Sequence, residues 1–294
     1  MLEETTNIGN ILTFDIEEWY HANYERVDFH MYETVPSRLS INVDRLIEIC
    51  DRHQIKTTCF IVGTVAKNNP QLVKKLYNAG HEIASHGYQH KLVYEMTPDE
   101  FYNDTKKSVD ILEDIIGEKI LGFRAPSWSV KKDTLLWFYQ TLEILGLRYS
   151  SSIYPGQTFL YGIPDFPEYI HHPRLENKFS TILEVPVPVT QILGKKIGFS
   201  GGFYLRLFPS YAIIRWSKQK NKDGKPVFFY LHPREIDPIE RRLPLPFLPR
   251  IIQYWGVNQC EKKLQRILDT FTPNFYPMKK LLQTDKNTMA GIKT

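Results

Sequence analysis

Apolar and polar residues along the chain alternate between two patterns, one typical of strands and the other of helices. Short apolar runs predict buried strands at 8–14, 57–62, 81–85, 119–123, 147–149 and 227–231, with a proline-containing edge candidate at 182–189. Apolar residues spaced three or four apart predict amphipathic helices at 43–50, 70–80, 98–117, 133–145 and 260–271. This alternation of strands and helices predicts an α/β protein with a parallel sheet, either open or closed into a barrel.

The pattern changes after residue 237. Several prolines between 238 and 249 predict an irregular segment before the last helix. We therefore expect a barrel-like domain over 8–237 and a C-terminal extension over 238–294 that packs on it. The aromatic, proline-rich stretch 243–255 could contact a membrane surface, but packing on the core is the preferred interpretation. The polar tail after residue 284 is expected to be loose.

Composition narrows the class of protein. The 294 residues include 42% apolar and 13% aromatic residues, which can build a full core and argue against disorder. The net charge is only +4, with the two signs interspersed, so no basic stripe points to nucleic acid. Neither a signal-peptide pattern nor an apolar run near the ~18 residues of a membrane span is visible, which favours a cytoplasmic protein. The sequence does not indicate an oligomeric state.

The chain contains three scattered cysteines, Cys50, Cys59 and Cys260. They give no disulfide framework, and this also favours a reducing compartment. Cys50 and Cys59 lie within apolar patterns, so we expect both to be small buried hydrophobic residues.

Two histidines, His86 and His90, follow the predicted strand at 81–85 and stand four positions apart. Neutral imidazoles at this spacing can point the same way and bind a divalent transition metal. A third ligand is needed, and the acidic residues after the first strand are candidates. Asp15, His86, Arg124 and His232 each follow a predicted strand. Because the carboxyl ends of parallel strands share one face, we expect these residues to meet in one cleft.

Such a cleft has the groups needed for metal-assisted hydrolysis of an amide or ester. His86, His90 and one carboxylate would hold the metal and leave positions open for water and substrate. A second carboxylate would take the proton of the attacking water, and Arg124 would orient that base and keep it ionised. His232 would protonate the leaving nitrogen or oxygen.

Four segments carry a family resemblance: Thr13-Phe14-Asp15 with Glu17 and Glu18, Ser85-His86 through His90, Arg124-Ala125-Pro126-Ser127, and Tyr230-Leu231-His232. In this order they resemble the motifs of the polysaccharide deacetylase superfamily, the NodB-homology domain of carbohydrate esterase family 4. The set is most similar to the bacterial branch associated with exopolysaccharide production. The resemblance implies a distorted (β/α) barrel of fewer than eight full units. It also implies Asp15 as general base, His86 and His90 as metal ligands, and His232 as general acid.

The sequence departs from the family pattern in three places. Ile16 replaces the second of two adjacent aspartates, so the second acid is Glu17 or Glu18. We prefer Glu17, because a residue two positions along a strand faces the same side as Asp15. Ser150 stands where the family has an aspartate that tunes the catalytic histidine, so His232 is tuned by Glu235 or Asp237, or the activity is weak. Arg234 stands where this branch often has tryptophan, so the wall of the substrate site can differ too.

The combined prediction is a metal-dependent hydrolase of linear amide C–N bonds that removes N-acetyl groups from hexosamine units of a polysaccharide or its precursor. Zn fits two histidines and a carboxylate, although Fe, Co, Ni or Mn can use the same ligands. The expected contacts to the saccharide come from five residues: Trp19, Tyr20, Pro126, Trp128 and Gly202. Two alternatives stay open: a hydrolase of small cyclic amides or imides, and a degenerate protein that binds glycan without turnover.

Overall fold

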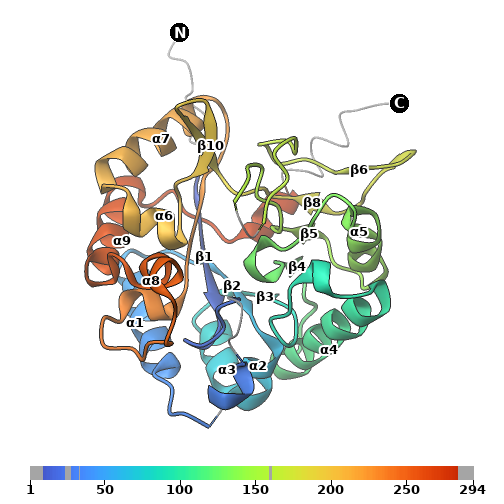
Figure 1. Cartoon of the computed structure of the whole chain (residues 1–294), viewed down its shortest axis with the longest axis horizontal. Helices are drawn as coiled ribbons and strands as arrows, with labels where there is room; N and C mark the ends of the chain where they lie inside the picture. The colour runs from blue at the N-terminus through green and yellow to red at the C-terminus, as the bar shows by residue number, and fades with distance from the viewer. Residues whose placement is uncertain (1–8, 24–27, 33, 159–160, 284–294) are drawn as a thin grey trace.

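The computed structural model describes residues 9–23, 28–32, 34–158 and 161–283. Its centre is a seven-stranded, all-parallel sheet with the order β11-β1-β2-β3-β4-β5-β8 (Figure 1). The strands are β1 (Ile11–Ile16), β2 (Thr58–Ile61), β3 (Glu82–Ser85), β4 (Gly122–Phe123), β5 (Tyr149–Ser150), β8 (Leu183–Glu184) and β11 (Phe228–Leu231). Buried residues occupy both faces of β1, as expected when helices cover a parallel sheet.

Helices surround this sheet, so the molecule is a distorted α/β barrel, as the sequence predicts (Figure 1). They are α1 (Leu39–Arg52), α2 (Gly63–Asn68), α3 (Pro70–Asn78), α4 (Pro98–Ile116), α5 (Leu135–Ile144), α6 (Gly202–Leu207), α7 (Ser210–Lys222), α8 (Phe247–Tyr254) and α9 (Val257–Phe271). A capping box formed by Thr97 and Glu100 starts α4. None of the helices in the described ranges is long and apolar enough to cross a membrane.

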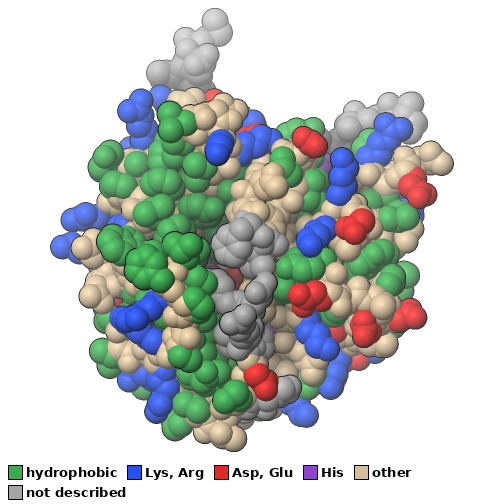
Figure 2. Space-filling view, viewed as in Figure 1, with side chains coloured by type: hydrophobic (Ala, Val, Ile, Leu, Met, Phe, Trp, Pro, Cys, Tyr) green, Lys and Arg blue, Asp and Glu red, His purple; other side chains and the backbone are tan. Residues whose placement is uncertain are grey.

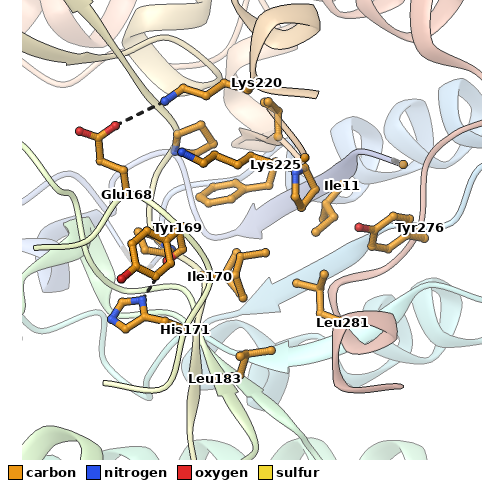
Figure 3. Close-up of a pocket in the computed structure, with 18 of the residues that line it drawn as sticks. Ile11, Glu168, Tyr169, Ile170, His171, Leu183, Lys220, Lys225, Tyr276 and Leu281 are labelled. Carbon is orange, nitrogen blue, oxygen red and sulfur yellow. Dashed lines mark hydrogen bonds and ion pairs between the residues drawn. The ribbon is translucent and has the colours of Figure 1, made fainter. Parts of the chain in front are cut away.

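Two small antiparallel pairs, β6 (Arg174–Leu175) with β7 (Lys178–Phe179) and β9 (Val189–Ile192) with β10 (Lys195–Gly198), lie outside the main sheet. The sheet itself stays open, because its end strands β8 and β11 are not paired with each other in the described structure. A cavity of about 660 Å³ lies beside this opening and contacts Ile11, Leu183 and Phe228, near the first residues of β1, β8 and β11 (Figure 3).

The C-terminal helix α9 packs on the barrel. Cys260, Leu264 and Ile267 of α9 join the same buried cluster as Val43 of α1 and Phe229 of β11. The three cysteines are free and buried, which confirms the expectation for Cys50 and Cys59. The tail at 284–294 and the predicted first strand residue, Ile8, lie outside the described residues.

Two predicted elements differ in extent from the observed ones. The helix expected from Pro70 is preceded by the short helix α2, which packs against α4 and was not predicted. The edge strand expected at 182–189 pairs with the main sheet only at Leu183–Glu184, because Pro186 and Pro188 cannot donate hydrogen bonds to a sheet ladder. β8 is nevertheless at the edge of the sheet, where a strand next to prolines is tolerated.

Gly201 lies against β11, the strand that ends at the predicted general acid. It forms a parallel bridge to Tyr230, and a Cβ atom at this position would lie 2.2 Å from the backbone oxygen of Tyr230. Gly201→Ala should therefore lower the free energy of unfolding by about 2 kcal/mol through overpacking. Urea unfolding would measure this change.

The control is Gly224→Ala. Gly224 has a positive φ but open space around its Cβ position, so alanine there should cost only about 1 kcal/mol of backbone strain. Equal losses for both variants would show that contact with β11 does not constrain Gly201.

Candidate active site

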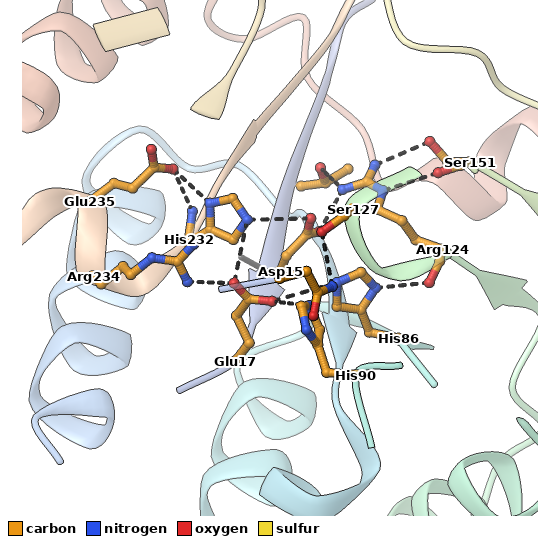
Figure 4. Close-up of polar contacts among 12 residues, drawn as sticks. Asp15, Glu17, His86, His90, Arg124, Ser127, Ser151, His232, Arg234 and Glu235 are labelled. Carbon is orange, nitrogen blue, oxygen red and sulfur yellow. Dashed lines mark hydrogen bonds and ion pairs between the residues drawn. The ribbon is translucent and has the colours of Figure 1, made fainter. Parts of the chain in front are cut away.

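A cleft of about 390 Å³ lies at the carboxyl ends of the strands. Asp15 is near the end of β1, Glu17 follows that strand, His86 follows β3, and His232 follows β11 (Figure 4). All four side chains, together with His90, line the cleft. The topology thus brings together residues that are more than 200 positions apart in sequence, as the strand-end prediction requires.

Glu17, His86 and His90 form a group that could hold a metal. One ligand atom from each residue lies within 4.8 Å of the other two, and all three residues are buried. Glu17 Oε2 lies 2.6 Å from His90 Nε2 and 3.7 Å from His86 Nε2. Two imidazole nitrogens and a carboxylate oxygen are typical of catalytic zinc sites and leave a position for substrate.

The protonation of this group also suits a metal. His86 Nδ1 donates a hydrogen bond of 2.8 Å to the backbone oxygen of Arg124, so its Nε2 lone pair points toward Glu17. Burial lowers the pKa of His86 to about 4, so the ring is neutral at neutral pH. Burial alone would raise the pKa of Glu17, but His90, Arg234 and His232 together hold it well below its usual value. The residues therefore present one anion and a neutral imidazole, the forms that bind a divalent cation.

Glu18, the other candidate ligand, points elsewhere. Its Oε2 accepts a hydrogen bond of 2.5 Å from Ser37, and burial raises the pKa of its carboxyl group. Among the described residues, the geometry brings Glu17 rather than Glu18 to the two histidines. The alternation of side chains along a strand explains the difference, since Asp15 and Glu17 face the cleft together.

Asp15 is paired with the buried side chain of Arg124. Arg124 Nη1 lies 2.5 Å from Asp15 Oδ1, and the guanidinium also donates to Thr13 Oγ1 and to Ser151. The central Cζ atom of the Arg124 guanidinium lies 4.0 Å from the centre of the Phe60 ring. The pairing leaves Asp15 Oδ2 facing His232 across the cleft, 3.9 Å from its Nε2 atom.

His232 is held by Glu235, one of the two acids considered as partners for it in place of Ser150. His232 Nδ1 donates to Glu235 Oε2 over 2.8 Å, so Nε2 faces the cleft. Glu235 Oε1 accepts a hydrogen bond of 2.7 Å from Arg206, a buried residue of α6. Burial opposes ionisation of Glu235, but Arg206 and His232 outweigh it and lower the carboxyl pKa. The other candidate, Asp237, pairs instead with Arg38 at 2.6 Å.

Two arginines of the site were not assigned a role from the sequence. Arg234 donates to Glu17 Oε1, the oxygen on the far side from His90 (Figure 4). Its place two residues after His232 marks it as unusual in the motif, and the sequence suggested only a changed substrate wall. Arg206 lies four residues after Gly202, in a helix that carries no motif. The only signal in the sequence is a cation among apolar residues, and the structure shows that this cation is buried.

The predicted saccharide contacts divide into two groups. Trp128 and Gly202 line the cleft. Trp128 and the preceding Ser127 both have left-handed backbone conformations, a strained arrangement that is typical of functional sites. Trp19 and Tyr20 instead pack with Leu243 in a separate buried cluster, and Pro126 is buried. The predicted contacts Trp19, Tyr20 and Pro126 therefore do not appear among the described residues that line the cleft.

Comparisons with known proteins agree with this geometry. Residues 11–149 match the family model described as polysaccharide deacetylase, and residues 151–283 match a domain of unknown function, DUF3473. The uncharacterised protein YlxY of Bacillus subtilis is 29% identical over 136 residues, which are 40% of this chain and 43% of that protein. A peptidoglycan-N-acetylglucosamine deacetylase of Bacillus cereus is 29% identical over 93 residues, or 32% of this chain and 34% of that protein. The chain thus spans less than half the length of these two relatives.

A solved structure shares the fold. The crystal structure of a Mycobacterium smegmatis protein, assigned as a polysaccharide deacetylase, superposes with a TM-score of 0.64 at 16% identity, covering 98% of this chain and 93% of that chain. The fold and the cleft define a distorted parallel α/β barrel with a histidine–carboxylate centre at its strand ends. Residues 11–149, just under half of the chain, match the polysaccharide deacetylase family, and the similarity to the Bacillus cereus protein agrees with this match.

The choice between Glu17 and Glu18 as metal ligand can be measured directly. Losing even a partner of a metal ligand weakens binding by about 10–100-fold. Glu17→Gln, which removes a ligand, should therefore reduce affinity for Zn²⁺ by about 100-fold or more. Glu18→Gln makes the same chemical change one residue away and should leave the affinity unchanged. Titration of chelator-treated protein with Zn²⁺ would compare them, and a larger loss in Glu18→Gln would contradict the geometry.

Proposed function

We propose that the protein is a metal-dependent hydrolase that removes N-acetyl groups from hexosamine units of a polysaccharide or its precursor. The observation that carries the proposal is the meeting of three groups of residues at one cleft: Glu17 with the two histidines, Asp15 with Arg124, and His232 with Glu235. Each group would supply one of the functions that amide hydrolysis requires. The bacterial exopolysaccharide-associated branch stays our prediction from the motifs.

His86, His90 and Glu17 would hold a divalent metal, for which we propose zinc. When bound there, the metal supplies polarisation of the amide carbonyl and a more acidic attacking water. The cluster is buried and close to Asp15 and His232, which would place the amide carbon between the two proton-transferring groups.

Asp15 is suited to accept the proton of the attacking water. Its Oδ1 atom is occupied by Arg124, so Oδ2 is the oxygen that faces the cleft. The Arg124 charge fixes the carboxylate in place. A base held in one orientation can accept a proton from water without the entropic cost of ordering its side chain.

His232 is suited to protonate the leaving nitrogen. The Glu235 carboxylate holds the hydrogen on Nδ1, so the second, transferable proton would sit on Nε2, which faces the cleft. Transfer of that proton to the amide nitrogen lets the C–N bond break, which releases acetate and a free amine. The proton that Asp15 takes from water balances the one that His232 gives to nitrogen.

Trp128 supports a polar, ring-shaped substrate. Its Nε1 atom is buried with no hydrogen-bond acceptor among the described residues, and its ring packs edge-on against Tyr230 with a centroid separation of 4.5 Å. An indole that lines a cleft with an unused donor can bond to a sugar hydroxyl while its face covers the ring. The alternative of a glycan-binding protein without turnover was motivated by Ser150, which replaces the family's aspartate. We propose that Glu235 takes the place of that aspartate beside His232.

Acetate release from N-acetylglucosamine oligomers tests the proposed activity. Wild type loaded with Zn²⁺ should release acetate. Asp15→Asn should keep the metal but lower kcat by about 100-fold or more, because the base is lost. His86→Ala should lose both the metal and the activity.

The contrary outcomes are equally clear. Wild type that binds metal but releases no acetate would overturn the deacetylase proposal, and cyclic amides would be tried next. Inactivity on those substrates as well would favour a glycan-binding protein.

Glu235 is proposed as a positioning residue for His232. Glu235→Gln keeps the shape but removes the charge, and we expect kcat to fall by about 100-fold while KM and metal content stay constant. Asp237→Asn removes a nearby carboxylate that pairs with Arg38 instead, so it should keep near wild-type kcat. A steady-state comparison on the same oligomers would decide, and equal kcat losses in both variants would contradict the assignment.

A further inference from the structure

The segment that leads into α9 exposes an unusual set of side chains. Between residues 238 and 255, every exposed side chain belongs to proline, another apolar residue or arginine, and none is acidic or uncharged polar. We call this surface the arginine–apolar face and define it by its seven principal residues: Ile239, Arg241, Arg242, Phe247, Leu248, Arg250 and Trp255. Figure 2 shows hydrophobic side chains gathered on the same side of the molecule, over α6, α7 and α8.

The apolar members of this face are well exposed. Phe247 is 75% exposed, Leu248 69%, Ile239 71% and Trp255 58%, although α8 and the loop before it bury Leu243 and Gln253. Elsewhere, exposed apolar residues such as Leu193 occur singly, which is ordinary for a protein surface. Large exposed apolar side chains gathered in one short segment, next to buried packing, indicate that something covers them.

The charge of the face indicates what covers it. Among the described residues, Arg241, Arg242 and Arg250 form no ion pair with a carboxylate, and Arg242 lies 5.2 Å from the Tyr254 ring. The two acids of the segment, Asp237 and Glu240, are buried. Three guanidinium groups beside exposed phenylalanine, leucine and tryptophan match a surface that presents phosphate oxygens above hydrocarbon. Helices with this composition lie in the plane of a membrane interface, where tryptophan is enriched.

We propose that the arginine–apolar face docks on the surface of an anionic lipid bilayer. Phe247, Leu248 and Trp255 would enter the interfacial layer, and the three arginines would bind lipid phosphates. The sequence favoured packing over membrane contact for 243–255. In the structure the segment packs through its inner side and leaves its outer side exposed.

The docked orientation bears on the cleft. Ile252 and Gln253, on the inner side of α8, line the cleft next to His232 and Arg234. The helix that would lie on the membrane is therefore also a wall of the site. Resting on the proposed function, this places the deacetylase cleft at the bilayer surface, where saccharide chains attached to lipid or emerging from the membrane would reach it.

Sedimentation with lipid vesicles tests the docking without depending on turnover. Vesicles of phosphatidylcholine alone would be compared with vesicles that also contain phosphatidylglycerol. Wild type should bind the anionic vesicles about tenfold more tightly, and added salt should weaken this binding. Phe247→Ser with Leu248→Ser should lose about tenfold in binding through lost apolar insertion. Arg241→Gln, Arg242→Gln and Arg250→Gln combined should lose about tenfold or more.

Phe179→Ser with Leu193→Ser is the matched control. These residues are 67% and 99% exposed on other parts of the molecule, so the control removes similar apolar surface and should bind like wild type. Thermal unfolding of every variant would show that the fold is kept, since all the changed side chains are exposed. Acetate release from soluble oligomers should be the same in all variants, so lost vesicle binding can be separated from lost catalysis.

Three results would overturn the proposal. Wild type that sediments with neither kind of vesicle would exclude a lipid surface as the partner. Vesicle binding that survives both sets of changes would place the contact elsewhere. A wild-type dimer that Phe247→Ser with Leu248→Ser converts to monomer, without vesicle binding, would assign the face to a second copy of the chain.

Discussion

The buried guanidinium of Arg124 is the interaction on which the rest of the site depends. It holds Asp15 of β1, donates to Thr13 on the same strand and donates to Ser151 after β5. Because Arg124 itself follows β4, one cation joins β1, β4 and β5. Its own backbone oxygen accepts the hydrogen bond that orients His86. Breaking one partner of such a buried pair costs about 3–5 kcal/mol, because the remaining charge is left without compensation. The geometry of the proposed base, Asp15, and that of the proposed metal ligand His86 are thus coupled through one residue.

Glu235 is the second buried charge on which the site depends. It connects His232, the proposed general acid, to the C-terminal part of the chain. Its two oxygens face different cations: one binds His232, and the other binds Arg206. Arg206 in turn donates to the backbone oxygens of Ile252 and Trp255 at the end of α8. A single chain of hydrogen bonds therefore runs from the cleft to the helix that carries the arginine–apolar face. The position of that helix and the position of the catalytic imidazole are set by the same buried charges.

The sequence predicted the parts of the fold and site that depend on local pattern. Apolar periodicity located the main strands and helices, and the rule that parallel strand ends share a face brought Asp15, His86, Arg124 and His232 together correctly. The choice of Glu17 over Glu18 followed from alternation along a strand. The aromatic residues were harder, because exposure depends on tertiary packing that a short motif does not encode. Trp19 and Tyr20 stand next to the motif, yet they are buried by Leu243 from more than 200 residues away.

The two family matches divide the chain at about residue 150, but the structure does not divide there. The first matched segment contributes β1 to β5 with the base and the metal ligands. The second contributes β8 and β11 with His232, Glu235 and Arg206. Because β11 pairs with β1 at one edge and β8 pairs with β5 at the other, the second segment completes both edges of the first. The segment of unknown function carries the proposed acid and its proposed positioning carboxylate, so residues of both segments line the same cleft, and neither segment alone contains all the residues of the candidate site.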